Sequence, residues 1–314
     1  MLTRLNGLVA ATFSPLDEKY RIKHDVIEQL VERYVAHQIA GIFICGSTGE
    51  AVSLSIKKRK ELAEAFIKAA SGKLKVMVHV GHNSVDEACD LAKHAQAIGA
   101  DAISAAPPSY FDISTAQQLV STLHPILAKA PDLPFFYYHI PSKTGVDISM
   151  IKLLEIAGEH LPSMAGIKYT AEKLDEFQTC INRFGSRFQM LYGFDEMYLY
   201  SLVAGGEAVV GSTYNYMAPL YHKIKESFLE GKLKLANKYQ QEAIDIIKVI
   251  ISYPLIPSQR SCMKFIGYDC GPAILPHCSL SKSEASELKA KLENTTFFKW
   301  ASIKALDPPE SKAG

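Results

Sequence analysis

Residues 135–169, FFYYHIPSKTGVDISMIKLLEIAGEHLPSMAGIKY, decide the fold class, because they contain two apolar strands separated by one amphipathic helix. The strands are predicted over Phe135–Ile140 and Ala165–Tyr169, and the helix over Ser149–Gly158. Both strands are apolar at successive positions, which is typical of a parallel sheet that helices cover on both faces. A strand, a helix and a second strand in about 35 residues form a parallel βαβ unit.

The same alternation recurs along the chain and predicts eight strands, each followed by a helix with apolar residues at i, i+3, i+4 and i+7. The predicted strands are Leu8–Phe13, Ile42–Cys45, Val76–Val80, Ala102–Ala106, Phe135–Ile140, Ala165–Tyr169, Met190–Tyr192 and Ala208–Val210. The helices are Asp25–Gln38, Lys57–Ala70, Asp86–Ile98, Thr115–Lys129, Ser149–Gly158, Leu174–Phe184, Met197–Ala204 and Met217–Leu229.

Eight such units in about 230 residues predict an α/β protein with a closed TIM (β/α)₈ barrel. The competing fold is a doubly wound open sheet, which often carries a glycine-rich phosphate loop. Neither GxGxxG nor GxxxxGK[ST] occurs in the sequence. The strand count and the missing loop therefore favour the barrel.

After Gly231 the pattern changes to helices alone, with runs at Leu235–Ile251, Ser258–Ile266 and Ser281–Leu292. We therefore predict a barrel over residues 1–231 and C-terminal helices packed on it over residues 232–306. Residues 307–314 lack large apolar side chains, and we expect them to form a disordered tail.

Composition excludes several classes of protein. The chain of 314 residues carries 34 Lys and Arg against 33 Asp and Glu, which is not the excess of a strongly basic nucleic-acid binder. Its apolar runs all fall short of the ~18 to 20 residues of a membrane span. The six cysteines are scattered and form no CxxC pair, which favours reduced thiols and a cytoplasmic location.

Lys168 is the most informative single residue, because it lies in the strand Ala165–Tyr169, which is otherwise apolar. A lysine inside a barrel loses hydration, which lowers its pKa and increases the fraction of free amine. A Schiff-base lysine needs that free amine. The alternative is a lysine that extends to solvent or pairs with a carboxylate.

Other candidates follow the predicted strands, since TIM-barrel active sites lie at the C-terminal strand ends. Ser47 and Thr48, in a glycine-bounded turn, suit an anion site or an ordinary turn. Tyr138 suits a general acid or base, or the core, and only one of Tyr137 and Tyr138 can face the barrel interior.

Two acidic residues and two histidines leave further alternatives open. Asp195 and Glu196 suit binding of sugar hydroxyls, or simply a helix start, where carboxylates complement the dipole. His79 and His82 form an HxxH pair, which is a weak metal signal because no third ligand lies close in sequence.

Four motifs together carry a family resemblance. GSTGE at 46–50, YHIP at 138–141, GIKYT at 166–170 and GSTYN at 211–215 follow the second, fifth, sixth and eighth predicted strands. In this order they resemble the pyruvate-dependent class I aldolases, the family of N-acetylneuraminate lyase and dihydrodipicolinate synthase. The resemblance runs from about residue 5 to residue 270 and implies a TIM barrel, usually in a homotetramer.

The resemblance also implies roles for individual residues. Lys168 matches the lysine that forms an imine with pyruvate, and Tyr138 the tyrosine that transfers the proton. Ser47 and Thr48 match the hydroxyls that hold the pyruvate carboxylate and relay protons, which places Ser47 in the catalytic set as well. Tyr110 matches a tyrosine contributed to the catalytic set across a subunit contact, although Ser109 stands where an aromatic residue is common.

The later strands favour one branch of the family. Gly193, Asp195 and Glu196 match the stretch that holds the polyhydroxy tail of a sialic acid, and Thr170 and Ser212 are expected near the substrate. Dihydrodipicolinate synthases typically have an arginine where this chain has Lys143. The resemblance thus implies cleavage of N-acetylneuraminate to N-acetylmannosamine and pyruvate, without metal or cofactor.

Three alternatives stay open at this point. Another aldehyde product would make the chain a 2-keto-3-deoxy sugar acid aldolase or a synthase of the same family. A metal-dependent aldolase would use His79 and His82. A relative without catalytic activity would act as a binding module, although Lys168 and Tyr138 argue against it.

Overall fold

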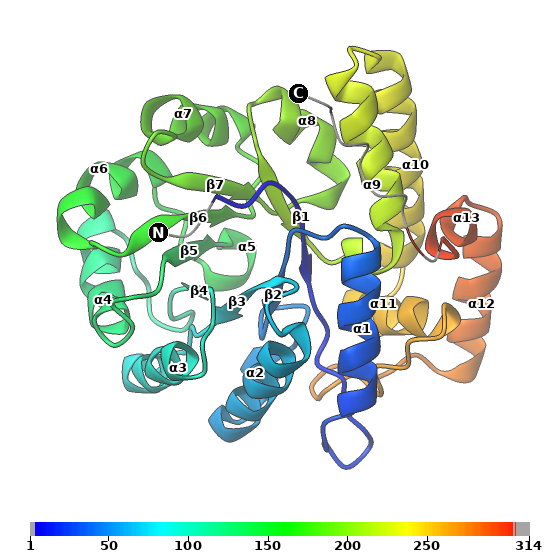
Figure 1. Ribbon diagram of the computed structural model, residues 1–314, viewed down its shortest axis with the longest axis horizontal. Helices are drawn as coiled ribbons and strands as arrows, with labels where there is room; N and C mark the ends of the chain where they lie inside the picture. Colours follow the sequence, from blue (N-terminus) through cyan, green and yellow to red (C-terminus); the bar gives the residue numbers. More distant parts are fainter. Residues whose placement is uncertain (1–3, 304, 306–314) are drawn as a thin grey trace.

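The computed structural model describes residues 4–303 and residue 305, and within them eight parallel strands close a barrel (Figure 1). Each strand pairs with the next in sequence, and β8 pairs with β1. The strands are β1 (Gly7–Ala11), β2 (Gly41–Ile44), β3 (Lys75–His79), β4 (Ala102–Ala105), β5 (Phe135–His139), β6 (Met164–Tyr169), β7 (Gln189–Tyr192) and β8 (Ala208–Gly211). The predicted barrel is confirmed, and the strand ends differ from the predicted ones by at most two residues.

Both faces of these strands are buried, as the continuous apolar runs predicted. Phe136 and Tyr138 of β5 pack with Phe43 and Met77 in a cluster inside the barrel. Tyr137, the residue between them, belongs to the second cluster, which fills the space between the strands and the outer helices. Tyr138 is therefore the member of the tyrosine pair that faces the interior.

Helices surround the barrel on its outside (Figure 1). They are α1 (His24–Ala36), α2 (Ile56–Ala70), α3 (Val85–Ala97), α4 (Ala116–Ala128), α6 (Met150–His160), α7 (Leu174–Phe184), α8 (Tyr198–Val203) and α9 (Tyr214–Leu229). The short helix α5 (Pro141–Thr144), which follows β5, lies over the middle of the ring in Figure 1. Side-chain caps fix several N-termini: Ser55, Ser84 and Thr115 each accept a hydrogen bond from a backbone N–H of the first turn.

The C-terminal part consists of helices that lie against one side of the barrel (Figure 1). They are α10 (Leu233–Ile251), α11 (Leu255–Phe265), α12 (Lys282–Glu293) and α13 (Phe297–Ala301). The division of the chain at residue 231 stays a prediction, and the predicted tail at 307–314 lies outside the described residues. Among the described helices, none combines the length and apolar character needed to cross a membrane.

Local expectations failed in a few places. The predicted helix Met217–Leu229 begins earlier, at Tyr214, and Met217 interrupts it with φ −136° and ψ 34°. Pro219 explains the kink, because its ring lacks an N–H and clashes with the carbonyl four residues before it. Helices of three to five residues, namely α5, α13 and the 3₁₀ turns η1 (Ala51–Ser53) and η2 (Asp195–Met197), escaped prediction because so few residues show no periodicity.

A buried ion pair connects the chain after β2 to the C-terminal helices. Arg260 on α11 donates from Nε and Nη2 to Oε2 of Glu50, at 2.8 and 2.5 Å. The other carboxylate oxygen of Glu50 accepts from the backbone N–H of Ile274 at 2.8 Å. Arg260 also donates to the carbonyls of Ser14 and Cys270. Both charged side chains are almost wholly buried, so each depends on the other for its charge compensation.

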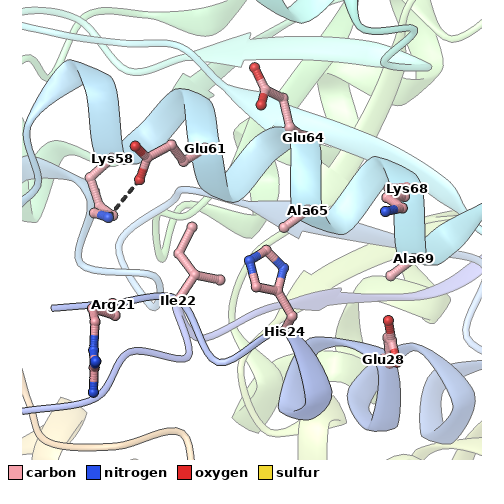
Figure 2. Close-up of a pocket in the computed structure, with 10 residues that line it drawn as sticks. All are labelled: Arg21, Ile22, His24, Glu28, Lys58, Glu61, Glu64, Ala65, Lys68 and Ala69. Atoms are coloured by element: carbon pink, nitrogen blue, oxygen red, sulfur yellow. Dashed lines mark hydrogen bonds and ion pairs between the residues drawn. The ribbon is translucent and has the colours of Figure 1, made fainter.

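We expect Glu50→Gln to destabilise the fold, because it leaves the Arg260 guanidinium buried without a counter-charge. The free energy of unfolding should fall by about 3 to 5 kcal/mol, measured by urea denaturation. The control is Glu61→Gln, which removes the surface pair between Lys58 and Glu61 shown in Figure 2 and should cost less than about 1 kcal/mol. Equal effects of the two substitutions would contradict the assignment.

Candidate functional site

Lys168 lies inside the barrel near the C-terminal end of β6, and its side chain is held between two aromatic rings. Its Nζ is 4.0 Å from the centre of the Phe43 ring on β2 and 3.8 Å from that of Tyr138 on β5. The residue is only 4% exposed. Tyr138 and Lys168 are register partners in neighbouring strands, which fixes their proximity through the backbone.

Burial controls the protonation of this amine. Loss of hydration lowers the pKa of Lys168, while hydrogen bonding to Tyr138 and the charge of Asp195 oppose the shift. The rings of Phe43 and Tyr138 offer the ammonium form a cation–π attraction that replaces only part of its hydration. The arrangement therefore favours a neutral, nucleophilic amine more strongly than an exposed lysine would.

Ser47 places a hydroxyl beside Tyr138, with the two oxygens 3.4 Å apart. Its turn follows β2 and is held at its C-terminal end, where the Ser14 hydroxyl donates to the carbonyl of Gly49 at 2.6 Å and Glu50 adopts a left-handed conformation at φ 53°. Thr48 is buried in the same turn. The structure thus brings together Lys168, Tyr138 and this turn, three of the site candidates named from the sequence.

His79 packs against the rings of Phe43 and Tyr138. It was named from the sequence for a different reason, as half of an HxxH pair that could bind a metal. Its ring centre is 5.9 Å from those of Phe43 and Tyr138. The Nε2 atom accepts a hydrogen bond from the backbone N–H of Ala106 at 3.1 Å, which places the ring proton on Nδ1. Burial, together with the charges of Arg59 and Lys168, holds the pKa of His79 well below its usual range.

The histidine pair does not gather a set of metal ligands in the part of the chain that the structure describes. His82 accepts a hydrogen bond at Nδ1 from the backbone of Ser84 in the loop after β3. Over residues 4–303 and 305, no three His, Cys, Asp or Glu side chains lie close enough together to hold a metal ion.

Asp195, after β7, points toward the end of β8 and is buried. Its Oδ2 accepts hydrogen bonds from the backbone N–H and the hydroxyl of Thr213, at 2.9 and 2.7 Å. A Cβ on Gly211 would lie 1.6 Å from its Oδ1, so only glycine allows the carboxylate to approach this strand. Burial raises the pKa of Asp195, and the hydrogen bonds from Thr213 oppose the shift.

The other predicted substrate-binding residues lie at neighbouring strand ends. A Cβ on Gly193 would lie 2.0 Å from the Thr170 hydroxyl, which shows how closely β6 and β7 approach there. Glu196 is half-buried, and this burial raises its pKa. Ser212, after β8, accepts a hydrogen bond from Nε2 of Gln259 at 2.8 Å.

Tyr110 lies apart from this cluster within a single chain. It is 83% exposed in the loop after β4, and its ring meets the equally exposed Phe111 edge-on, with centres 5.1 Å apart. Two exposed aromatic rings side by side form an apolar surface that a second chain could cover.

Sequence reasoning missed several residues of the site. Phe43, the second ring against Lys168, resembles any other apolar strand residue. Gln259 and Arg260 belong to α11, and their contacts with Ser212 and Glu50 join positions 47 and 210 residues apart. Gln259 had no detectable signal.

A surface cavity of about 630 Å³ lies elsewhere, between α1 and α2 (Figure 2). Its walls come from the outer helices and the loop before α1, and Figure 2 shows Lys58 and Glu61 on one side with His24 facing the cavity. These lining residues include none of the residues around Lys168.

Comparison with known proteins places this constellation in a family. Residues 4–295 match the Dihydrodipicolinate synthetase family. N-acetylneuraminate lyase of Gallus gallus is 38% identical over 296 residues, which cover 93% of this chain and 96% of that protein. Among solved structures, Proteus mirabilis N-acetylneuraminate lyase is 31% identical with a TM-score of 0.91, covering 94% of this chain and 100% of that one.

A second solved structure is described as a catalytic lysine mutant of Ruminococcus gnavus sialic acid aldolase. It is 27% identical with a TM-score of 0.87, and the match covers 92% of this chain and 95% of that chain. The barrel, the buried lysine and a match over nearly the whole chain agree: this chain belongs to the dihydrodipicolinate synthetase family.

Proposed function

We propose that this protein is an N-acetylneuraminate lyase, a carbon–carbon lyase that cleaves N-acetylneuraminate to N-acetylmannosamine and pyruvate. The observation that carries the proposal is the Lys168 amine, desolvated between Phe43 and Tyr138 at the C-terminal end of β6. The close likeness to the Gallus gallus lyase over 93% of the chain supports the choice of substrate.

The chemistry follows from the neutral amine. Lys168 attacks C2 of the open-chain keto acid, and loss of water leaves a protonated imine. Tyr138, which has given its own proton to the hydroxyl that left as water, removes the proton of the C4 hydroxyl, directly or through the substrate carboxylate. The C3–C4 bond breaks, with its electrons moving into the imine. N-acetylmannosamine leaves, and protonation of the resulting enamine at C3 followed by hydrolysis releases pyruvate and restores the amine.

The remaining polar groups bind two different parts of the substrate. Ser47 and Thr48 hold the pyruvate carboxylate, and the 3.4 Å contact between Ser47 and Tyr138 provides a path for the proton. Gly193, Asp195, Glu196, Thr170 and Ser212 surround the sugar end. Because Thr213 already occupies one oxygen of Asp195, the half-buried Glu196 is the carboxylate better able to meet a substrate hydroxyl.

The imine itself supplies the electron sink that a metal supplies in other aldolases, so the proposed reaction uses neither a metal nor an organic cofactor. We further propose a cytoplasmic location. All six cysteines are free thiols, five of them buried, as expected of a protein kept in a reducing compartment.

We also propose that the protein assembles as a homotetramer. Tyr110 would then belong to the catalytic set of a neighbouring subunit rather than its own. The exposed pair of Tyr110 and Phe111 supports this assignment, since an apolar surface of this kind costs free energy in water.

Incubation with N-acetylneuraminate should release pyruvate, whereas 2-keto-3-deoxy sugar acids and the substrates of dihydrodipicolinate synthase should react much more slowly. Pyruvate with borohydride should leave an adduct on Lys168, visible by mass spectrometry. Lys168→Ala should lose both properties, because no other residue replaces the nucleophile. Retention of lyase activity by this variant would refute the mechanism.

Tyr138→Phe provides the matched variant, because it keeps the aromatic ring over Lys168 and removes only the hydroxyl. Trapping of pyruvate should continue, while cleavage of N-acetylneuraminate should slow by about 10² to 10⁴, the usual contribution of a general acid or base. Steady-state turnover and mass spectrometry measure the two effects. Equal losses in trapping and turnover would contradict the proton-transfer role.

The lowered pKa of Lys168 predicts how the reactivity of its amine depends on pH. Because burial lowers its pKa, the amine should become reactive at a lower pH than a free lysine, whose pKa is about 10.4. Competitive acetylation with acetic anhydride across pH 6 to 11, with a lysine peptide as control, measures this directly. Reactivity of Lys168 that rises only at or above the midpoint of the peptide would contradict the desolvation argument.

Light scattering should give a mass in solution of four times the chain mass of 34.6 kDa. Tyr110→Ala should shift the assembly toward smaller species and lower turnover, because it removes an aromatic ring from the subunit contact. Tyr20→Ala, at another exposed tyrosine, is the control. A monomeric but fully active wild-type protein would rule out the assigned role of Tyr110.

A further inference from the structure

Helix α11 contacts the proposed site at two places through two consecutive residues. Arg260 is bound to Glu50, which follows the turn that carries Ser47 and Thr48, and Gln259 is bound to Ser212 after β8. Both residues of α11 are at least 95% buried. The C-terminal helices are therefore joined to the polar groups on both sides of β1.

Arg260 fixes where α11 sits. Its guanidinium is held by the carboxylate of Glu50 and by the carbonyls of Ser14 and Cys270. A planar group with this many partners has one position. Gln259, the preceding residue, is thereby held at a fixed place relative to the end of β8.

Gln259 determines how Ser212 uses its hydroxyl. The amide Nε2 donates to Ser212 Oγ at 2.8 Å, so this oxygen acts as an acceptor toward the protein. The backbone carbonyl of Ser212 is itself held by the side-chain amide of Asn215 at 2.6 Å. A hydroxyl has a single hydrogen, and here that hydrogen stays available to donate to something else.

We infer that Gln259 is a positioning residue for substrate recognition: it orients the Ser212 hydroxyl as a donor toward the polyhydroxy half of the ligand. This inference rests on the proposed lyase function and extends it to a helix outside the barrel. Because Gln259 is bound to Ser212 and acts through it, under this inference its effect is confined to binding of the sugar end, and imine formation with pyruvate is unaffected.

The substitution Gln259→Glu tests the inference, because it keeps the shape of the side chain and exchanges a donor for an acceptor. Ser212 would then donate to the new carboxylate instead of the ligand. We expect the KM for N-acetylneuraminate to rise about tenfold, the effect of one lost hydrogen bond, with kcat changed less than about threefold. Gln259→Leu, which removes the donor without adding charge, should raise KM in the same direction.

Two readouts separate this role from general damage to the fold. Trapping of pyruvate on Lys168 should proceed at the wild-type rate in both variants, since pyruvate has no polyhydroxy tail. In a Ser212→Ala background, Gln259→Glu should change KM less than about twofold, because contacts that act through one residue are not additive. Gln241→Glu, on the exposed face of α10, is the matched control.

Several results would overturn the inference. An unchanged KM in both Gln259 variants, an equal effect of Gln259→Glu with and without Ser212, or loss of pyruvate trapping would each do so. A wild-type protein that releases no pyruvate from N-acetylneuraminate would instead refute the proposed function, so the two failures are distinguishable.

Discussion

Hydrogen bonds between β1 and β8 close the barrel, and the candidate site depends on this closure. Gly7 to Ala10 pair with Ala208 to Gly211, which joins the beginning of the chain to its eighth strand. Closure makes the C-terminal ends of all eight strands meet at one rim. Ser47, Tyr138, Lys168 and Ser212 come from four different strand ends, and closure brings these ends to the same rim because the sheet has no free edge.

The closed barrel also buries a lysine, and burial removes the hydration that a charged amine needs. Lys168 replaces an apolar residue in a cluster of interior side chains, and burial disfavours its charged form. Phe43 and Tyr138 enclose the amine, and the hydrogen bond to Tyr138 offsets only part of its lost hydration. An ionisable side chain in an apolar interior is unfavourable for stability, and natural proteins accept such residues most often at functional sites. Here the unfavourable burial yields a neutral amine, which is the form that the proposed chemistry needs.

The sequence predicted the barrel well because its signal is local and repeated eight times. The strand of Lys168 follows from an apolar run, and the two-residue period of a strand predicts that only one of Tyr137 and Tyr138 faces the interior. The structure shows that it is Tyr138. Details that depend on distant residues were missed. The hold of Thr213 on Asp195, for example, requires the contact between β7 and β8. The kink at Met217 is different, because it follows from Pro219 two residues later, a local signal that was not used in predicting this helix from the sequence.

The C-terminal helices show where sequence reasoning stops, and why. Ile256, Arg260 and Met263 follow one another at helical spacing, and all three are buried in α11. A charged residue on an apolar stripe indicates a buried partner, because an isolated buried charge is very costly. The pattern thus indicates that Arg260 has a buried partner but does not identify it. The partner, Glu50, lies 210 residues earlier in the chain and is brought to Arg260 only by the fold. Once that pair is formed, the position of Gln259 beside Ser212 follows from the helix backbone, so a segment expected to be an appendage contacts a residue of the candidate site.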